Sequence, residues 1–581
     1  MAEKFYLATF GCRVNQADSA AMKKQLEDEG FRQSEDVSDC SVIIVNSCTV
    51  THRSDQQVRQ LTRKLRRENP TARLIVTGCY AQRDPKMLAE MDEVDLVLGN
   101  LEKEQICDFL NGSTGQQVQE SAGQQVSRST GQEVIGYRSS VTAHQSSVVN
   151  AECGMGNAEF PIADCGLQIA DCGLQIADCP ADHAIRNPQL ENPQSNISHS
   201  AFSIPHSAFG KSAIRNPQSE IPHSAFGPFP IPHSPNPQSA IRNPQLEKSA
   251  IRNPQSPLPL PIPSYFDNSK VFVSDLSRET EIEVQPVTTL EGKTRPFVKI
   301  QEGCDSRCSY CIVPFVRGAG RSVPPDSVLL QVRQLLDEGY KEIVLTGIHL
   351  GSYGSKLKPR VKLEELVCRL LDVCELHQLR LSSIEPMRFS RKLIDLAVGD
   401  ARFAPHFHLP LQSGSDFILG AMNRTYGREQ YADLIAEIHQ RLPHASIGTD
   451  VMVGFPGETE ESFEETRRFI EELPLAYLHV FPFSRRTGTV AAEMENQVNE
   501  SDKSSRVEIL RRLSAQKLRA FEDRFLGSVL RALVLHEREA GYWTGLTGNY
   551  LKVKIPVEQS GPNEFIFVTL QRRGDLLYGF P

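Results

Sequence analysis

Three cysteines stand close together in the segment VKIQEGCDSRCSYCIVPFVRG, at a spacing that suits a compact loop. Cys304, Cys308 and Cys311 form a CxxxCxxC motif after a predicted strand, residues 297–301. The spacing does not fit a disulfide framework, and it differs from the CxxC of thioredoxin-like proteins and from paired zinc knuckles. The chain holds fourteen cysteines and shows no secretory features. Its cysteines therefore indicate metal or redox chemistry.

A second set of cysteines follows the ends of predicted strands. Cys12, Cys48 and Cys79 stand in GC, NSC and TGC contexts. Because the carboxyl ends of parallel strands lie at one edge of a sheet, we expect the three thiols to converge there. Three thiolates without an obvious fourth ligand suit an iron–sulfur cluster with one open iron, whereas structural zinc usually takes four ligands. The alternative is three buried core cysteines, which are common in proteins.

Short apolar runs and helical stretches alternate around this second set. Strands are expected over residues 5–10, 42–47, 73–78 and 94–99, and helices over residues 18–29 and 54–68. The alternation predicts an N-terminal α/β domain of parallel strands with right-handed crossovers. The second helix is basic. A run of this kind is usually a helix face exposed to solvent, and the alternative is a surface that contacts RNA phosphates. Its cationic residues are Arg53, Arg59, Arg63, Lys64, Arg66 and Arg67.

Strands and helices alternate again after the CxxxCxxC motif. With residues 297–301, strands are expected over residues 341–347, 379–385, 406–412, 446–456 and 476–484. Six strand–helix units predict a partial (β/α)6 barrel whose chemistry lies at the carboxyl ends of the strands. Polar or small residues occur on or just after these strands, although each is also a possible helix cap or turn residue. They are Gly347, His349, Ser383, Glu385, Gln412, Ser413 and Asp450.

The C-terminal segment has a different pattern. A helix rich in Arg and Lys is expected over residues 503–524. From residue 526, apolar and polar residues alternate between Gly and Pro turns, which predicts a small antiparallel β-barrel.

A stretch of repeats, from about residue 112 to residue 263, does not resemble the rest of the chain. IADCGLQ recurs every seven residues, SAIRNPQ variants follow, and prolines are frequent. Aromatic and charged residues are sparse, so we expect a disordered insertion. Cys165, Cys172 and Cys179 repeat with it and are not expected to bind metal. The expected domains are residues 1–111, 112–265 (the insert), 266–520 and 521–581.

Composition sets the outer limits of function. The 581 residues carry a net charge of −9, so any contact with nucleic acid must come from local patches. No apolar run is long enough for a membrane span, and the first residues lack the layout of a signal peptide. We therefore expect a cytoplasmic protein without a membrane partner.

The CxxxCxxC loop, with Tyr310 beside its last cysteine, resembles the radical S-adenosylmethionine (SAM) superfamily. The resemblance implies that three thiolates bind a 4Fe–4S cluster and that SAM chelates the fourth iron. It assigns the catalytic cluster to Cys304, Cys308 and Cys311. It also implies SAM contacts at Tyr310, Gly347, His349, Ser383, Glu385, Gln412 and Asp450.

The C-terminal segment resembles the TRAM domain, an RNA-binding module of tRNA-modifying enzymes. The resemblance implies phosphate contacts and base stacking. The candidates are Lys552, Lys554, Arg572 and Arg573 for phosphates and Tyr542, Trp543 and Tyr550 for stacking.

The three parts in this order resemble the methylthiotransferase family, with Cys12, Cys48 and Cys79 as ligands of an auxiliary 4Fe–4S cluster. GCRVNQADSAAM, residues 11–22, is similar to the MtaB type, which acts on N6-threonylcarbamoyladenosine in tRNA, although Arg13 stands where lysine is more typical. One SAM would then methylate sulfur at the auxiliary cluster. Reductive cleavage of a second would give a 5′-deoxyadenosyl radical that takes hydrogen from C2 of the base.

The implied partners are the anticodon stem-loop of tRNA and a reductant such as flavodoxin or ferredoxin; the sulfur donor stays open. Methylthiolation of isopentenyladenosine or of a ribosomal-protein aspartate is an alternative. A non-catalytic RNA-binding protein with structural metal sites is a further one.

Overall fold

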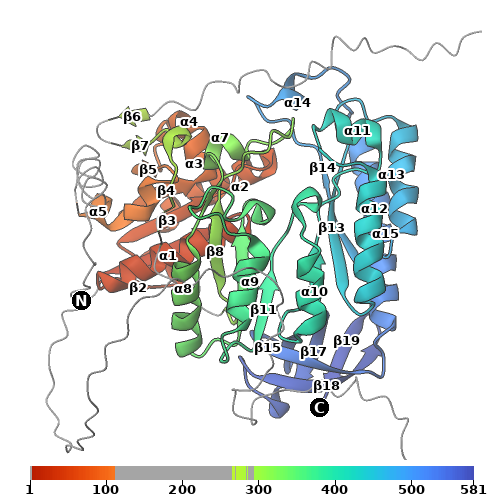
Figure 1. Ribbon diagram of the computed structural model, residues 1–581. Helices are drawn as coiled ribbons and strands as arrows, with labels where there is room; N and C mark the ends of the chain where they lie inside the picture. Colours follow the sequence, from red (N-terminus) through yellow and green to blue (C-terminus); the bar gives the residue numbers. More distant parts are fainter. Residues whose placement is uncertain (1–2, 112–264, 268–269, 283, 285–292) are drawn as a thin grey trace, which may run out of the picture. The chain divides into compact units, whose positions relative to one another are not determined.

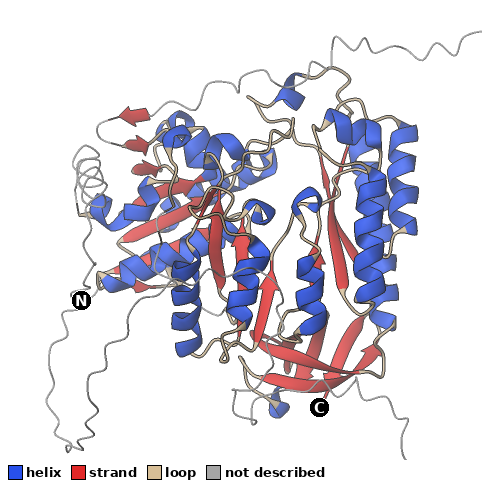
Figure 2. Cartoon of the chain, in the orientation of Figure 1, coloured by secondary structure: helices blue, strands red, loops and turns tan. Residues whose placement is uncertain are grey.

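The computed structural model describes residues 3–111, 265–267, 270–282, 284 and 293–581 (Figure 1). The repeats, with Cys165, Cys172 and Cys179, lie outside these residues. Helices cover the sheets in a layered α/β arrangement, and a strand-rich segment ends the chain (Figure 2). None of the described helices is both long and apolar enough to cross a membrane.

The N-terminal sheet has seven strands in the order β2-β1-β3-β4-β5-β7-β6, all parallel except β6 against β7. This confirms the expected parallel α/β arrangement, and every residue of β3 is buried, as its Val/Ile-rich run requires. The strands are β1 (Lys4–Thr9), β2 (Arg32–Gln33), β3 (Val42–Ser47), β4 (Arg73–Gly78), β5 (Leu96–Leu98), β6 (Tyr265–Asp267) and β7 (Val271–Val273). The helices are α1 (Arg13–Asp28), α2 (His52–Glu68), α3 (Cys79–Arg83), α4 (Pro85–Ala89) and α5 (Ile106–Leu110).

Strands β6 and β7 return to this first sheet after the repeats. Leu98 of β5 is paired with Phe272 of β7. The chain therefore leaves the sheet after α5 and re-enters it at residue 265, so the repeats interrupt the N-terminal sheet. The boundary expected at residue 266 instead divides β6, leaving Tyr265 in the insert, and places β7 in the next domain.

The central region contains six strands that pair in parallel. They fall into two sheets, β11-β10-β8-β9, where β9 is an antiparallel edge, and β12-β13-β14. A single bridge, Leu379 to Phe403, continues the first sheet toward β12. The strands are β8 (Phe297–Glu302), β9 (Arg321–Ser322), β10 (Glu342–Gly347), β11 (Gln378–Leu381), β12 (His406–His408), β13 (Ser446–Val453) and β14 (Tyr477–Pro482). The helices are α7 (Val313–Arg317), α8 (Pro325–Asp337), α9 (Leu363–Leu371), α10 (Lys392–Gly399), α11 (Asp416–Ala421), α12 (Arg428–Arg441), α13 (Glu460–Glu472) and α14 (Val490–Glu493).

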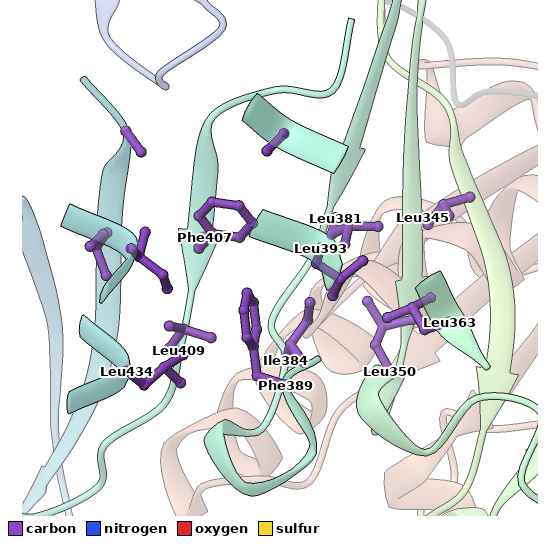
Figure 3. Close-up of a cluster of buried hydrophobic side chains, with 14 of the residues drawn as sticks. Leu345, Leu350, Leu363, Leu381, Ile384, Phe389, Leu393, Phe407, Leu409 and Leu434 are labelled. Atoms are coloured by element: carbon purple, nitrogen blue, oxygen red, sulfur yellow. The ribbon is translucent and has the colours of Figure 1, made fainter. Parts of the chain in front are cut away.

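The main hydrophobic core lies between these strands and the outer helices (Figure 3). Leu345, Leu381 and Phe407 come from β10, β11 and β12, whereas Leu393 and Leu434 come from α10 and α12. Side chains alternate across a strand, so the residues between the core residues face the opposite side. We call that opposite side the inner face. It is polar, and it carries the groups discussed below.

The C-terminal helix α15 (Glu500–Asp523) leads into a closed barrel in the order β15-β16-β17-β19-β18. Adjacent strands pair antiparallel except β17 with β19, which confirms a C-terminal antiparallel sheet. The strands are β15 (Val529–Glu539), β16 (Tyr542–Thr547), β17 (Lys552–Pro556), β18 (Phe565–Arg573) and β19 (Leu576–Phe580).

Candidate functional site

The first cysteine triad lies at the carboxyl ends of three neighbouring strands. Cys12, Cys48 and Cys79 follow β1, β3 and β4, which are adjacent in the sheet. Burial, reinforced by the nearby Cys79 and Cys12 thiols, raises the pKa of Cys48 to about 11. The structure therefore brings the three thiols together at one edge of the sheet.

Glycine allows the loops of this triad to approach each other. Gly11 has φ +98°, and a Cβ built there would lie 2.8 Å from Cys48 Cβ and 3.0 Å from Cys48 Sγ. Any other residue at this position would have a strained backbone, and its Cβ would clash with Cys48. Asn15 then lies between two of the thiols, because its Oδ1 is 3.9 Å from the Sγ atoms of both Cys12 and Cys79.

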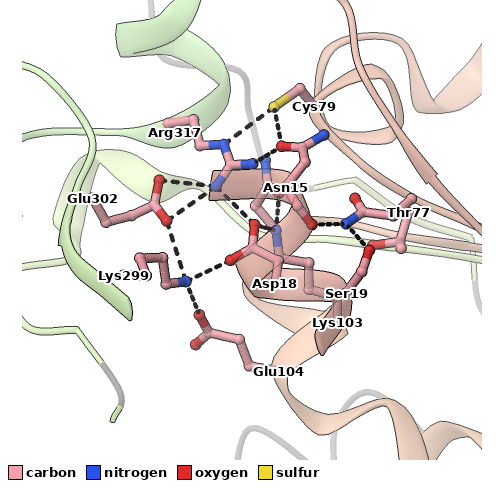
Figure 4. A network of polar contacts seen from close by, with 12 residues as sticks. Asn15, Asp18, Ser19, Thr77, Cys79, Lys103, Glu104, Lys299, Glu302 and Arg317 are labelled. Carbon is pink, nitrogen blue, oxygen red and sulfur yellow. Dashed lines mark hydrogen bonds and ion pairs between the residues drawn. The ribbon is translucent and has the colours of Figure 1, made fainter. Parts of the chain in front are cut away.

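A buried arginine from the central region reaches this triad. Arg317 donates from Nε to Cys79 Sγ at 3.1 Å, and its Nη2 donates to Asn15 Oδ1 (Figure 4). Burial would lower the pKa of the Arg317 guanidinium, but Cys79 and two carboxylates outweigh it and raise that pKa. Arg317 is therefore a permanent positive charge beside the thiols.

The carboxylates that hold Arg317 belong to a buried ionic network (Figure 4). Arg317 Nη1 lies 3.0 Å from Asp18 Oδ2 and 3.0 Å from Glu302 Oε1. Asp18 also accepts from Lys103 at 2.6 Å and from Lys299 at 2.6 Å. Burial would raise the pKa of Asp18, but the cations outweigh it and hold that pKa well below its usual range. This network joins α1 to the inner face of β8, and so fixes the N-terminal triad against the central region.

The second triad occupies the loop between β8 and α7. Cys311 N donates to Cys308 O at 3.0 Å, and Ser306 N donates to Cys304 Sγ at 3.3 Å. Gly303, with φ +67°, opens the loop, and a Cβ there would lie 2.1 Å from Ala319 O. Burial and the neighbouring thiols raise the pKa of Cys304 and of Cys311. Both thiols would therefore release a proton on binding iron.

Arg424 is the cation of the second triad. Its Nη1 donates to Cys308 Sγ at 3.2 Å, and its Nη2 is paired with Glu385. Glu385, which is expected at a strand end, is thus linked to the second triad: it pairs with Arg424, and Arg424 donates to Cys308. Tyr310 is partly buried against Phe455 with ring centroids 6.5 Å apart. Burial raises the pKa of the Tyr310 hydroxyl, so it stays protonated.

Short helix α7 connects the two triads. It begins two residues after Cys311 and ends at Arg317, which donates to Cys79. Ile312 and Val316 pack with Cys79 in a small apolar cluster. One five-residue helix therefore connects the loop of the second triad with Cys79 of the first.

Polar atoms without partners occur among the other predicted residues. His349 Nε2 and Gln412 Oε1 are buried and make no hydrogen bond to any described residue. His349 N donates to Gln301 Oε1 at 2.6 Å, so the backbone of His349 is held while Nε2 of its ring has no partner among the described residues. Gln412 has φ 71°, a strained value for a residue other than glycine. Gly347 ends β10, where a Cβ would lie 2.9 Å from Gln301 Cβ.

Ser383 and Asp450 lie in different settings. Ser383 is exposed, just after β11. Asp450 lies on the inner face of β13, 3.0 Å from His408 Nε2 and 3.2 Å from His479 Nδ1. Burial would raise the pKa of Asp450, but these hydrogen bonds hold it below its usual range. The ligand atoms of the three side chains all lie within 4.8 Å of one another.

The chemistry of both donor sets fits an iron–sulfur cluster. Each triad offers three cysteine sulfurs, the ligands that such clusters take. A guanidinium donates to one sulfur of each triad, Arg317 to Cys79 and Arg424 to Cys308. These cations offset the negative charge that the thiolates would carry when a cluster is bound.

Several expected RNA contacts are engaged within the protein. Arg572 is paired with Glu522 and Asp523, and Tyr550 stacks on His406 with ring centroids 4.1 Å apart. Lys552 is exposed, and Lys554 is paired with Glu539. Arg573 lies over Tyr578 and Phe580, Tyr542 packs edge-on to Tyr578, and Trp543 lies under Arg538.

The basic residues of α2 are divided between internal contacts and solvent. Arg59, Arg63, Lys64 and Arg66 make internal contacts, whereas Arg53 and Arg67 are exposed.

Sequence reasoning missed the arginines beside the thiols. Arg317 lies six residues after Cys311, in the VPFVRG run that continues the motif. Its closeness to the motif in sequence could have indicated that it lies near the cysteines. Arg424 is 116 residues from Cys308, and no local pattern marks it. Asn15 and Asp18 lie in the GCRVNQAD segment, but that motif by itself assigns neither of them a place beside the thiols.

Comparisons with known proteins agree with this geometry. Residues 4–99 match the family described as Uncharacterized protein family UPF0004, and residues 298–470 match the Radical SAM superfamily. A relative named threonylcarbamoyladenosine tRNA methylthiotransferase MtaB, from Aquifex aeolicus, is 29% identical over 95% of this chain and 96% of its own. The protein of that name from Bacillus subtilis is 28% identical over 97% and 93%.

A different group of relatives matches a shorter stretch. A tRNA-2-methylthio-N(6)-dimethylallyladenosine synthase from Desulforamulus reducens is 37% identical over 48% of this chain and 60% of its own. The resemblance drawn from the two cysteine motifs is thus confirmed over nearly the whole length. The chain belongs to the radical SAM methylthiotransferase family, with the MtaB proteins as its full-length relatives.

Proposed function

We propose that the protein methylthiolates C2 of N6-threonylcarbamoyladenosine next to the anticodon of tRNA, giving 2-methylthio-N6-threonylcarbamoyladenosine. One observation carries the proposal. Helix α7 connects two thiol triads, each of which has its own buried arginine. A transferase of sulfur and methyl groups needs both centres at one substrate, and this helix holds them together.

We assign one 4Fe–4S cluster to Cys304, Cys308 and Cys311 and an auxiliary one to Cys12, Cys48 and Cys79. When bound, the two clusters and SAM supply radical activation of the base and a source of methylated sulfur. The protein's own residues hold, orient and shield these groups. Arg317 and Arg424 donate to one thiol of each triad, which offsets the negative charge of the thiolates.

The proposed SAM contacts are the strand-end residues Tyr310, Gly347, His349, Ser383, Glu385, Gln412 and Asp450. The unpartnered atoms of His349 and Gln412 support this assignment, because buried polar groups without a partner are uncommon in folded proteins. A ligand with ammonium, carboxylate and ribose groups would satisfy them. The absent Cβ of Gly347 lets Gln301 pack against the end of β10, and Gln301 in turn accepts a hydrogen bond from His349 N.

The finer architecture belongs to the same proposal. The six parallel strands would form a partial (β/α)6 barrel, and the C-terminal barrel would be a TRAM domain that contacts the anticodon stem-loop. We assign residues 1–111, together with β6 and β7, to the auxiliary-cluster domain, the repeats to the insert, the chain from β8 to residue 520 to the radical SAM core and residues 521–581 to the TRAM-like domain. A cytoplasmic reductant such as flavodoxin or ferredoxin would supply electrons.

The main alternative substrate is isopentenyladenosine. The dimethylallyladenosine synthases are more alike in sequence, but only over about half of this chain. The MtaB relatives match across all of its parts. Sequence similarity within the radical SAM region is explained by the chemistry that both groups of enzymes share. Similarity over the whole chain also covers the surfaces that select a substrate. We therefore favour the threonylcarbamoyl substrate over isopentenyladenosine and over a ribosomal-protein aspartate.

Mass spectrometry of tRNA nucleosides tests the proposal. The gene would be expressed in a host that lacks its own methylthiotransferases. We expect 2-methylthio-N6-threonylcarbamoyladenosine to appear. The isopentenyl analogue alone would keep the chemistry and overturn the substrate. If soluble, iron-loaded protein gave neither product, the assignment to tRNA would be wrong.

A further inference from the structure

Tyr550 of the C-terminal barrel packs against the inner face, among three arginines. Its residue lies between β16 and β17, with φ +69°. Arg380 lies over the Tyr550 ring at 5.2 Å, and Arg13 Nη2 donates to its hydroxyl at 3.3 Å. Arg295 and Tyr550 also interact electrostatically. We call Arg13, Arg295 and Arg380 the arginine cluster.

The charges of the arginine cluster are not balanced. Glu342 is paired with Arg380 at 2.7 Å and with Arg295 at 3.2 Å. Arg13 contacts Tyr550 and lies 5.9 Å from the Phe297 ring centroid, and no described carboxylate forms an ion pair with it. Three guanidinium groups therefore share one carboxylate. Keeping the half-buried guanidinium of Arg13 charged beside two other arginines costs free energy unless an anion binds next to it.

His406 provides a second, independent sign of a ligand. It is only 1% exposed, and its Nδ1 has no partner among the described residues. Its Nε2 is within 2.8 Å of Tyr477 Oη, and its ring stacks on Tyr550. Burial and the nearby Arg380 lower the pKa of His406, so its ring is neutral. A polar side chain this deeply buried normally has all its hydrogen-bonding atoms satisfied.

We propose that Arg13, supported by Tyr550 and His406, binds the carboxylate of the threonylcarbamoyl side chain on N6 of the substrate. The inference rests on the proposed function and deepens it. A carboxylate satisfies the guanidinium through charge-assisted hydrogen bonds. An apolar N6 group, such as isopentenyl, leaves Arg13 unpaired. Arg13 thus selects between the two classes of modified adenosine.

The place of Arg13 in the chain agrees with this role. It directly follows Cys12, which belongs to the auxiliary triad, and it is the first residue of α1. In the purine, N6 and C2 stand on either side of N1. A carboxylate held at Arg13 therefore keeps the C2 edge of the base near the cysteine triad that would supply sulfur.

A pair of RNA probes tests the proposal. Both are anticodon stem-loops, one with N6-threonylcarbamoyladenosine and one in which the threonine carboxylate is a primary amide. Binding to the reconstituted enzyme is measured by fluorescence anisotropy, and methylthiolation is measured in single turnovers. We expect the wild type to bind the acid about ten- to a hundredfold more tightly than the amide, as a hydrogen-bonded charge allows.

Variants then locate the preference. Arg13→Gln should bind acid and amide equally, and Arg13→Lys should retain part of the preference because it keeps the charge without the planar fork. Arg333→Gln, an exposed arginine on α8, is the matched control and should behave as the wild type. Iron content and the cluster absorption spectrum show whether the auxiliary cluster survives next to residue 13.

Each other outcome has a distinct meaning. A wild type without acid preference overturns the inference, and so does an unchanged preference in Arg13→Gln. Equal weakening of both probes in Arg13→Gln, with the preference kept, would make Arg13 a contact to an RNA phosphate instead and also overturns it. Failure of the proposed function looks different. In that case the wild type binds but forms no product from the acid probe.

Discussion

Arg317 Nε donates to Cys79 Sγ across 238 residues of sequence, at 3.1 Å. Arg317 ends the helix that follows the CxxxCxxC loop, whereas Cys79 is the first residue of α3, directly after strand β4 of the N-terminal sheet. The same guanidinium binds Asp18 and Glu302, so it links the two regions through both charge and hydrogen bonds. The position of one cysteine triad is therefore fixed by a residue close to the other.

Replacing this arginine should loosen the auxiliary site. In Arg317→Gln, two buried carboxylates lose a shared cation and Cys79 loses its donor. Breaking a buried ion pair costs about 3–5 kcal/mol, so the unfolding transition should move to lower denaturant. Iron per chain should fall toward the content of one cluster. Arg333→Gln should change neither value, and full iron loading of Arg317→Gln would contradict the prediction.

Removing one thiol of the second triad should separate the two halves of the reaction. Cys308→Ala leaves two thiolates, which we expect not to retain the catalytic cluster, so 5′-deoxyadenosine formation should be abolished. The auxiliary cluster should persist. Cys374→Ala, an exposed cysteine outside both triads, is the control and should cleave SAM normally. Ordinary 5′-deoxyadenosine production by Cys308→Ala would refute the assignment.

Arg424 offers a test of how the protein tunes that cluster. It donates to Cys308 and pairs with Glu385. Because a nearby cation favours the more negative, reduced cluster, Arg424→Gln should shift the reduction potential to more negative values. The rate of SAM cleavage with a weak reductant should fall severalfold, and a stronger reductant should restore part of it. A potential equal to that of the wild type would argue against this role.

The strands, and the places of the six cysteines after strand ends, could be predicted because their signals are local. The apolar runs at residues 42–47 and 73–78 match β3 and β4 residue for residue. Each Gly–Cys pair marks a strand end where positive φ and a close approach are needed, as at Gly11 and Gly303. Parallel pairing then brings the thiols together without further information.

What the sequence could not reveal depends on contacts between distant segments. Arg424 lies far from Cys308 in the chain, and Tyr550 was expected on an RNA-binding surface but packs on His406. The last strand, β19, was not recognised, and β7 was placed outside the sheet that it joins. Such partners are chosen by three-dimensional packing, which periodicity along one segment does not encode.

The buried network around Asp18 should make stability depend on acid pH. The folded pKa of Asp18 lies below its unfolded value, so its stabilisation is fully present above about pH 4 and is lost as the pH falls through the folded pKa. Asp18→Asn should lower the free energy of unfolding at pH 7 by about 3–5 kcal/mol. It should also make the free energy of unfolding depend less on pH at acid pH. Unfolding curves between pH 3 and pH 7 provide the measurement. Asp326→Asn, at an exposed pair, should keep the wild-type profile.

Deleting the repeats should leave the enzyme nearly intact. The segments on either side of them, α5 and β6–β7, belong to the same N-terminal sheet domain, so both ends are anchored there without the repeats. A deletion of residues 120–260 keeps residues 112–119 and 261–264 to connect α5 with β6, and a loop of this length costs little closure entropy. Nucleoside analysis of tRNA should show within about twofold the wild-type level of product. Loss of soluble, folded protein on deletion would show that the repeats contribute to the fold.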